Sequence, residues 1–554
     1  MNFILILLAA IVVLLLGYLF YGRYLANKWG IDPSRETPSQ DCFDGKDYVP
    51  TPPVVVMGHH FASIAGAGTI IGTVKAAAFG WLPALLWILV GSVFFAAAHD
   101  FGALFASLRH KGRSLGRVLR EHVGEKAQRV FTVFALLVLV LLVACFTNVV
   151  ANTFASSAEN GILSVGAGQV SAQAGAGAAS ILFVLVGLLF GLLVFRKNLP
   201  MIPMTILCLL LMAGSVWAGL NLGLNLPYAV WVGIIAVYLV AAALAPVWSL
   251  LQPRDYLSAF LLWGMMLCCL VVLLLPHEIT APLPAVNLEG QNPVYALLSV
   301  LVIGGAVSGY NALIASGTTS KQLANEKHAR AVSVGSVLLC ALLALIVLLA
   351  MREINLYDYS ASPLDEFAHR VANAAGSKLA YSLILLTVSV FALTTLDTLT
   401  RLARYLFAEL FNPDNRRLKK LEGAQRFFAT PAVGTLIVVL LGCGLGLVRE
   451  LDRLWPLFGA ANLLLAGLAM MSAAIWLRSE GKKTWMLIVP MFVSLAAALA
   501  FLVWNAVLAV LSPASWLDWL TLGCSALLAV PAVILLAQGL PALFGKKQAE
   551  PEEE

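Results

Sequence analysis

The stretch DYVPTPPVVVMGHHFASIAGAGTIIGTVKAAAFG (47–80) decides the fold. Its second half is apolar and long enough to enter a membrane, yet it carries several glycines, the adjacent His59 and His60, and Lys75. Glycine costs a helix about 1 kcal/mol relative to alanine, and a charge at membrane depth costs about 3 kcal/mol or more. A broken, polar helix is tolerated at that depth only where it is buried in protein or lines a cavity. The sequence therefore predicts that residues 58–80 form the wall of a pathway.

Composition places the whole chain in a membrane. Its 554 residues are 60% hydrophobic and 12% charged, whereas soluble domains carry about 25% charged residues. The formal charge of +6 does not indicate nucleic-acid binding, because the basic residues lie in loops between apolar runs. No spacing of cysteine or histidine predicts a disulfide framework or a metal site. We find no nucleophile–base pair in the spans that would predict an enzyme. We expect an all-α, multi-pass protein of the lipid bilayer that needs no cofactor.

Apolar runs of about 20 residues, the length that crosses a bilayer, occur about fifteen times. When the loops are assigned alternately to two sides, one side holds 29 of the 35 lysines and arginines and the other holds five, with Lys75 inside a span. Cytoplasmic loops are enriched in these residues. The distribution predicts an N-terminus outside the cell and a cytoplasmic C-terminus.

Two of the predicted spans are interrupted. The span 57–76 runs outward and is interrupted at 66–68, and the span 227–251 runs inward and is interrupted near Pro246, where proline removes a backbone donor. Many secondary transporters place substrate between inverted halves that each begin with such a helix. We predict a five-plus-five inverted repeat; the alternative is that glycine and proline are common in membrane helices. The predicted parts are an N-terminal helix and loop (1–56), a first repeat (57–220), a second repeat (227–410), C-terminal helices (411–545) and an acidic cytoplasmic tail (546–554).

Several motifs resemble those of one transporter family. They are DYVPT (47–51), GHHFASIAGAGTIIG (58–72), SLGRVLREHVG (114–124), PVWSLLQPRDYLS (246–258), GGAVSGYNALIASGTTSKQLANE (304–326), LDTLTRLARY (396–405) and LWPLFGAANLLLAGLAM (454–470). Together they are similar to the carbon starvation protein A family of bacterial inner-membrane transporters. The resemblance implies an APC/LeuT-like fold, uptake of peptides or pyruvate, and coupling to an ion gradient.

The chain departs from the family pattern inside the expected pathway. Thr69 and Thr73 stand where the family usually has proline, and Lys75 stands where it usually has an apolar residue. The pair Tyr310 and Asn311 stands where Phe-His is common. We expect these positions to set the substrate preference.

Candidate substrate contacts gather at the two interruptions. Backbone N–H groups freed at Gly66 and Gly68 would attract a carboxylate; the alternative for these glycines is close helix packing. Lys75 either faces an anionic substrate or snorkels outward. The residues that we predict to bind substrate are Gly66, Gly68, Thr69, Thr73, Lys75, Pro246, Trp248, Tyr310 and Asn311.

Ionisable groups inside the spans are candidates for ion coupling. His59 and His60 either handle a proton or a gate, since histidine titrates near neutrality, or they cap and pack. Asp397 has Arg401 four residues later, so a structural ion pair is its alternative. The predicted coupling residues are His59, His60, Asp100, Ser308 and Asp397, and the predicted gate is Arg254 with Asp255.

These observations predict an ion-coupled secondary transporter that imports a small carboxylated nutrient, a peptide or pyruvate, by alternating access. We favour the proton over sodium as the coupling ion. The competing hypothesis is a membrane sensor that binds nutrient without net transport. Such a sensor would carry a soluble signalling module, and no loop is long enough to form one.

Overall fold

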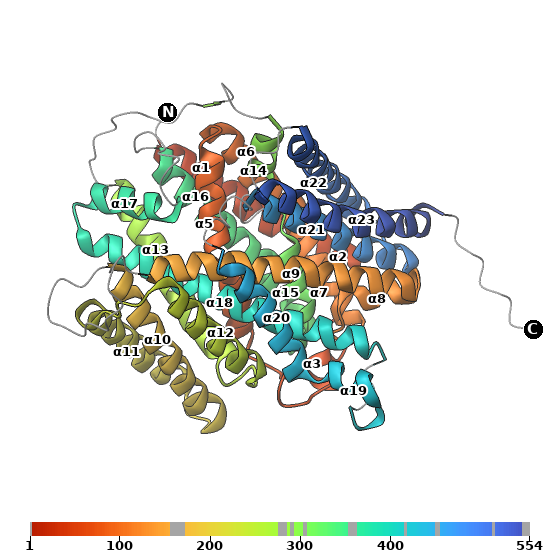
Figure 1. Cartoon of the computed structure of the whole chain (residues 1–554), viewed down its shortest axis with the longest axis horizontal. Coiled ribbons are helices and arrows are strands. Elements are labelled where there is room, and N and C mark those ends of the chain that lie inside the picture. The colour runs from red at the N-terminus through yellow and green to blue at the C-terminus, as the bar shows by residue number, and fades with distance from the viewer. Residues whose placement is uncertain are drawn as a thin grey trace, which may run out of the picture.

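The computed structural model describes residues 3–155, 172–274, 285–287, 293–302, 307–352, 363–414, 418–448, 455–511 and 516–545. These residues form a bundle of helices (Figure 1). Eleven helices are long and apolar enough to cross a membrane, and the number rises to thirteen if each of two bent pairs counts as one span. The prediction of an all-α polytopic membrane protein is confirmed.

The first half of the bundle contains two long helical rods, because the π-helical segments Gly17–Gly22 and Gly91–Ala96 join α1 to α2 and α6 to α7. The helices in this half are α1 Phe3–Leu16, α2 Arg23–Trp29, α3 Pro38–Asp41, α4 Pro53–Ile64, α5 Ala67–Ala77, α6 Trp81–Val90, α7 Ala97–Arg109, α8 Leu115–His122, α9 Glu125–Phe154, α10 Ala172–Gly191, α11 Met201–Leu222 and α12 Tyr228–Leu244.

The second half contains the longest helix, α18. The helices in this half are α13 Leu251–Leu274, α14 Pro293–Leu301, α15 Gly309–Gly317, α16 Ser336–Arg352, α17 Pro363–Ala375, α18 Lys378–Phe411, α19 Gly423–Ala429, α20 Pro431–Gly446, α21 Trp455–Ser479, α22 Trp485–Leu511 and α23 Trp516–Phe544.

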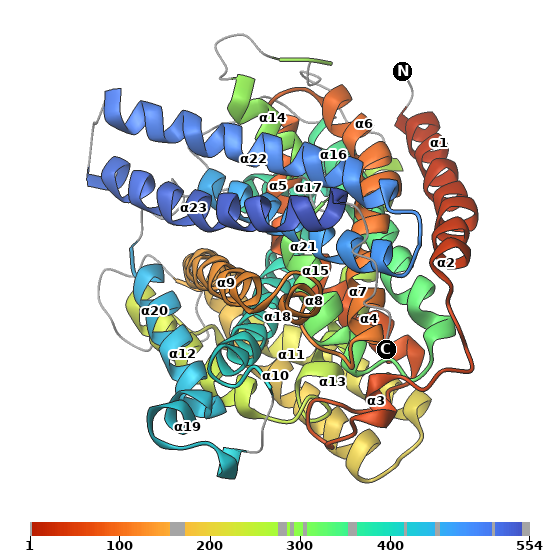
Figure 2. The ribbon, with the colours of Figure 1, turned by 90° about the vertical axis from the view of Figure 1, so that its right-hand side faces the viewer.

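The layers of the bundle follow from burial. The apolar windows of α18 and α21 are 94% and 100% buried inside the protein, whereas those of the first and last spans are 22% buried. Helices α18 and α21 therefore form the centre, and α1 and α23 lie at the periphery (Figure 2). Helix α9 packs along α18, and α4 lies against α13.

The opening stretch forms a broken span. Helix α4 ends at Ile64, Gly66 is extended with a ψ of −174°, and α5 begins at Ala67 at an angle of 42° to α4. A Cβ at Gly66 would lie 2.4 Å from the hydroxyl oxygen of Thr395 in α18. Glycine at this position lets the break approach α18 closely.

A second break occurs inside residues 295–316, an apolar run that is long enough to cross a bilayer. Helix α14 ends at Leu301, and α15 begins only at Gly309, after an extended Ser308. The side-chain oxygen of Asn462 in α21 accepts a hydrogen bond from the backbone N–H of Tyr310 at 2.9 Å. A side chain from another helix therefore satisfies one of the free N–H groups at this helix start.

The predicted interruption near Pro246 does not break a single span: α12 ends at Leu244, and residues 245–250 form the turn that connects it to α13, which begins at Leu251. In this turn the backbone N–H of Val247 donates to the carbonyl of Lys46 at 2.9 Å. The turn is therefore anchored to the segment that precedes α4.

Loops predicted to lie on the same side of the membrane contact one another. On the lysine- and arginine-rich side, Val49 N–H donates to the carbonyl of Lys321 at 3.2 Å, and Arg120 pairs with Asp414 at 2.8 Å. At another place, Leu82 N–H donates to the carbonyl of Ala285 at 3.1 Å. We call the lysine- and arginine-rich side, which holds these first contacts, the basic face.

We expect Gly309→Ala to destabilise the protein. Its Cβ would lie 2.5 Å from the backbone nitrogen of Ala466 and 2.6 Å from the carbonyl oxygen of Asn462, so α15 and α21 would have to separate. Overpacking of this kind costs about 1–3 kcal/mol and should lower the thermal unfolding midpoint in detergent. The control is Gly264→Ala in α13, where nothing lies within 4 Å of the added Cβ. Equal midpoints for the two variants would contradict the close contact.

Candidate functional site

A small cavity lies where the two broken spans meet. Its volume is about 50 Å³, which is room for a few waters, because one water needs about 10–15 Å³. None of its lining side chains is charged. It is lined by Ser63, Ile64, Gly66, Gly68, Thr69, Leu142, Phe146, Val302, Ser308, Tyr310, Asn311, Thr395, Phe458 and Asn462.

Both helix starts at the breaks face this cavity. Among the described residues, no side chain is seen to accept a hydrogen bond from the first N–H groups of α5, whereas Asn462 caps α15 and also donates to the hydroxyl of Ser308 at 3.0 Å. The N-terminus of a helix carries a partial positive charge and free N–H groups. The cavity therefore offers an anion a favourable potential without a basic side chain.

Next to the cavity, His59 starts a buried chain of ionisable groups. Its Nδ1 lies 2.7 Å from Asp255 Oδ2, and its Nε2 lies 3.2 Å from the hydroxyl of Thr318. The other oxygen of Asp255 accepts from Arg254 at 2.9 Å, and Arg254 also pairs with Asp397 at 2.8 Å. All four ionisable side chains are buried. Four groups from α4, α13 and α18 thus form one connected chain.

His60 forms a separate buried pair. Its Nε2 lies 2.9 Å from Asp100 Oδ2 in α7, and its Nδ1 lies 2.8 Å from the hydroxyl of Thr319. Successive residues of a helix point about 100° apart. This angle explains how two adjacent histidines reach carboxylates on different helices.

Some buried polar atoms beside these pairs have no hydrogen-bond partner among the described residues. They include Oδ1 of Asp100 and Oδ1 of Asp397. Tyr238 donates to the other oxygen of Asp397 at 3.2 Å. The two free carboxylate oxygens are places where a proton can be accepted.

Asp397 does not form the i,i+4 ion pair with Arg401 that the sequence offered as the alternative. Arg401 instead pairs with Asp47 at 3.3 Å and donates to the carbonyls of Ala242 and Ala245. Arg404 also pairs with Asp47, at 3.2 Å. Burial acts to raise the pKa of Asp47, but Arg404 and Arg401 outweigh it and hold the pKa below its ordinary value.

The predicted residues separate into three groups. Gly66, Gly68, Thr69, Ser308, Tyr310 and Asn311 line the cavity, and His59, His60, Asp100, Arg254, Asp255 and Asp397 form the buried pairs. The remaining four, Thr73, Lys75, Pro246 and Trp248, lie outside both.

The residues outside the site have other contacts. Thr73 donates to the carbonyl of Thr69 at 2.7 Å, and Pro246 and Trp248 lie in the turn after α12. The ammonium of Lys75 lies 5.0 Å from the ring centroid of Trp455. Trp455 also contacts Phe146, which lines the cavity, so two aromatic side chains connect Lys75 to the cavity.

Sequence reasoning missed several members of the site. Ser63, Thr395 and Asn462 line the cavity, and Thr318 and Thr319 contact the two histidines. A single asparagine within the apolar run 454–477 was a signal for Asn462. Nothing in the sequence distinguished Ser63 or Thr395 from ordinary helix hydroxyls.

Comparisons of the sequence with a family profile and with known proteins agree on one family. The sequence profile described as "Carbon starvation protein CstA" matches residues 2–378 and 361–500. "Peptide transporter CstA" of Escherichia coli (strain K12) is 30% identical over 581 residues, which cover 88% of this chain and 79% of that protein. "Pyruvate/proton symporter BtsT" of the same organism is 33% identical over 368 residues, which cover 63% of this chain and 49% of that protein.

The likeness extends to solved structures. A manganese transporter from Eremococcus coleocola superimposes with a TM-score of 0.50 at 13% identity, over 90% of this chain and 98% of that one. At this identity the likeness concerns the fold alone. On the profile match and the relatives' identity, the chain belongs to the carbon starvation protein CstA family.

Proposed function

We propose that the protein imports a small carboxylate together with protons by alternating access. The observation that carries this proposal is the pair of adjacent buried histidines, each bonded to a carboxylate, beside a cavity at two helix breaks. The relatives are named as a peptide transporter and a pyruvate/proton symporter, which supports transport over nutrient sensing. Sodium remains the alternative coupling ion.

The chemistry of the cavity supports a carboxylate as the substrate group. The uncapped N–H groups at Gly66 and the start of α5 can donate to it, and Thr69, Ser308 and Asn311 offer further donors. Ligand pockets usually measure about 300–1,000 Å³, whereas this cavity measures about 50 Å³. We infer that the structure represents a closed state, which suits a molecule of pyruvate size and must widen for a peptide.

Charge balance supports the proton as the coupling ion. The chain His59–Asp255–Arg254–Asp397 contains two carboxylates and one guanidinium, so it is neutral when it holds one extra proton on His59 or a carboxylate. The pair of His60 and Asp100 is neutral under the same condition. A buried uncompensated charge costs several kcal/mol, so each arrangement favours binding one proton when the site closes.

The contacts also support a revised inverted repeat. Helix α13 packs against α4, and α21 packs against α15. We propose that the second repeat begins at α14 and α15, not at 227–251, and comprises α14/α15, α16, α18, α20 and α21. The first repeat would comprise α4/α5, α6/α7, α9, α12 and α13, with α10 and α11 inserted. Together with α1, α22 and α23, this arrangement gives about fifteen spans.

Contacts join the segments of the basic face, and we propose that this face is cytoplasmic, with the N-terminus outside and the C-terminus inside. The segment before α4 is tied to α18 by Asp47. Gln252 of α13 donates to the hydroxyl of Thr51 at 2.8 Å and to Gln322 at 2.9 Å. Opening this side requires these bonds to break, which is a gating step of the alternating-access kind.

The direct test is uptake into proteoliposomes under separately imposed gradients. We expect an inward proton gradient to drive accumulation of labelled pyruvate or labelled alanyl-alanine, and a protonophore to abolish it. An inward sodium gradient without a pH difference should not drive accumulation. Accumulation driven by sodium alone would identify sodium as the coupling ion. Binding without accumulation under either gradient would indicate a sensor.

Gly68→Ala tests the cavity. The added Cβ would lie 3.5 Å from Phe146 Cζ, an ordinary contact, so the fold should tolerate it while the substrate loses space. The loss of one methyl-sized volume should raise KM for uptake by about tenfold or more, with an unchanged unfolding midpoint. The control is Gly233→Ala in α12, where nothing lies within 4 Å. The same KM in both variants would place the substrate elsewhere.

A further inference from the structure

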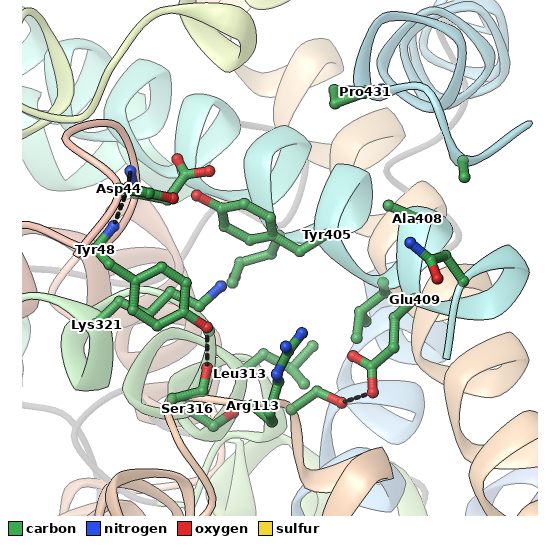
Figure 3. Close-up of a pocket in the computed structure, with 18 of the residues that line it drawn as sticks. Asp44, Tyr48, Arg113, Leu313, Ser316, Lys321, Tyr405, Ala408, Glu409 and Pro431 are labelled. Carbon is green, nitrogen blue, oxygen red and sulfur yellow. Dashed lines mark hydrogen bonds between the residues drawn. The ribbon is translucent and has the colours of Figure 1, made fainter. Parts of the chain in front are cut away.

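A second and larger cavity lies at the basic face. Its volume is about 270 Å³, and it is bounded by the segment before α4, the segment before α8, the end of α15 and the C-terminal part of α18. Figure 3 shows Tyr48, Arg113, Lys321, Tyr405 and Glu409 around it. We call this space the lower cavity.

The lower cavity continues the path of the first one. Helix α15 contributes Asn311 to the small cavity at the helix breaks, which we call the upper cavity, and Leu313 and Ser316 to the lower one. Asn311 and Ser316 are five residues apart, which is about 7.5 Å along a helix axis. Helix α18 likewise contributes Thr395 above and Tyr405 below. The same two helices therefore line both cavities.

Two cations line the lower cavity without a direct counter-charge. The ammonium of Lys321 lies 3.6 Å from the ring centroid of Tyr405 and 5.3 Å from that of Tyr48. Arg113 is half-buried. Within the described part of the chain, neither side chain forms an ion pair or a side-chain hydrogen bond.

Three carboxylates also line the cavity, and each is held by groups other than Arg113 and Lys321; Asp44 accepts from the backbone N–H groups of residues 46–48. Asp47 pairs with Arg401 and Arg404, and one oxygen of Glu409 accepts from Ser114 at 2.9 Å and from Gln128 at 3.1 Å. The aromatic rings hold the ammonium of Lys321 in place by cation–π attraction but do not neutralise it. An anion that enters the cavity would find two cations that lack a direct partner.

We infer that the lower cavity is an exit site, where Arg113 and Lys321 bind the carboxylate of the transported substrate before its release at the basic face. This inference rests on the proposed function. It assigns to Lys321 of the SGTTSKQLANE motif a role in substrate release. The cavity is also large enough to receive a substrate that has left the smaller one.

The titration of Lys321 supports this role. Burial removes its ammonium from water and lowers its pKa to about 8, against the opposing effect of Asp47. Affinity for an anion should therefore fall as the pH rises through about 8, whereas Lys321→Arg should keep its affinity. The charged or titratable groups that face Lys321 are Asp44, Asp47, Tyr48, Arg113, Arg404, Tyr405 and Glu409.

The test compares the two sides of the membrane. In proteoliposomes of known orientation, Arg113→Gln and Lys321→Met should raise the half-saturating concentration of labelled pyruvate or alanyl-alanine on the basic-face side by about tenfold. The half-saturating concentration on the opposite side should change by less than about twofold. Retained uptake from the opposite side shows that the variants fold.

The controls are exposed cations of the same face outside the cavity. Lys327 is exposed and Arg129 is 70% exposed, so Lys327→Met and Arg129→Gln should leave both concentrations unchanged. Equal effects of Arg113→Gln and Lys321→Met on both sides, or no effect, would overturn the exit site while transport stands. The exit site would also be overturned if inorganic phosphate competed with labelled substrate as strongly as unlabelled substrate does, and if this competition required Lys321. Absence of uptake by the natural protein would instead reject the proposed function.

Discussion

The structure depends on the pairing of charges that are buried inside a membrane bundle. Moving an unpaired ion into such a place costs several kcal/mol, and the centre of this bundle holds Asp100, Arg254, Asp255 and Asp397. His59 and His60 complete the pairing on two sides of α4. Because they are adjacent on one helix, any movement of α4 strains both pairs at once. In the proposed mechanism, this arrangement links proton binding to the position of α4.

The helix breaks provide the second part of the mechanism. At Gly66 and at Ser308 the backbone leaves the helix, and the N–H groups of α5 and α15 face one cavity. The histidine pairs lie on α4, only a few residues before the first of these breaks. A substrate carboxylate at the start of α5 and a proton on His59 or His60 therefore act on the same short segment. In the proposed mechanism, this proximity couples substrate binding to proton binding.

Much of the fold was predictable, because hydropathy and loop charge report directly on membrane spans. The break at Gly66 was predictable because glycine and polar residues coincide there. The break before Gly309 was not predicted, although Gly304, Gly305 and Ser308 precede it, and its cap comes from Asn462, about 150 positions later. The partner of Asp397 was also mispredicted, because spacing along a helix favours Arg401 while tertiary packing places Arg254 closer. Local patterns cannot report such long-range pairings.

The central claim is that the two histidine pairs carry the coupling proton, and substrate-driven alkalinisation measures it most directly. Substrate counterflow, which needs no net proton movement, serves as the control in the same vesicles. In the variant with His59→Gln and His60→Gln, we expect counterflow to continue while substrate no longer alkalinises the outside medium. Alkalinisation at the rate of the natural protein, with counterflow intact, would show that the proton travels elsewhere.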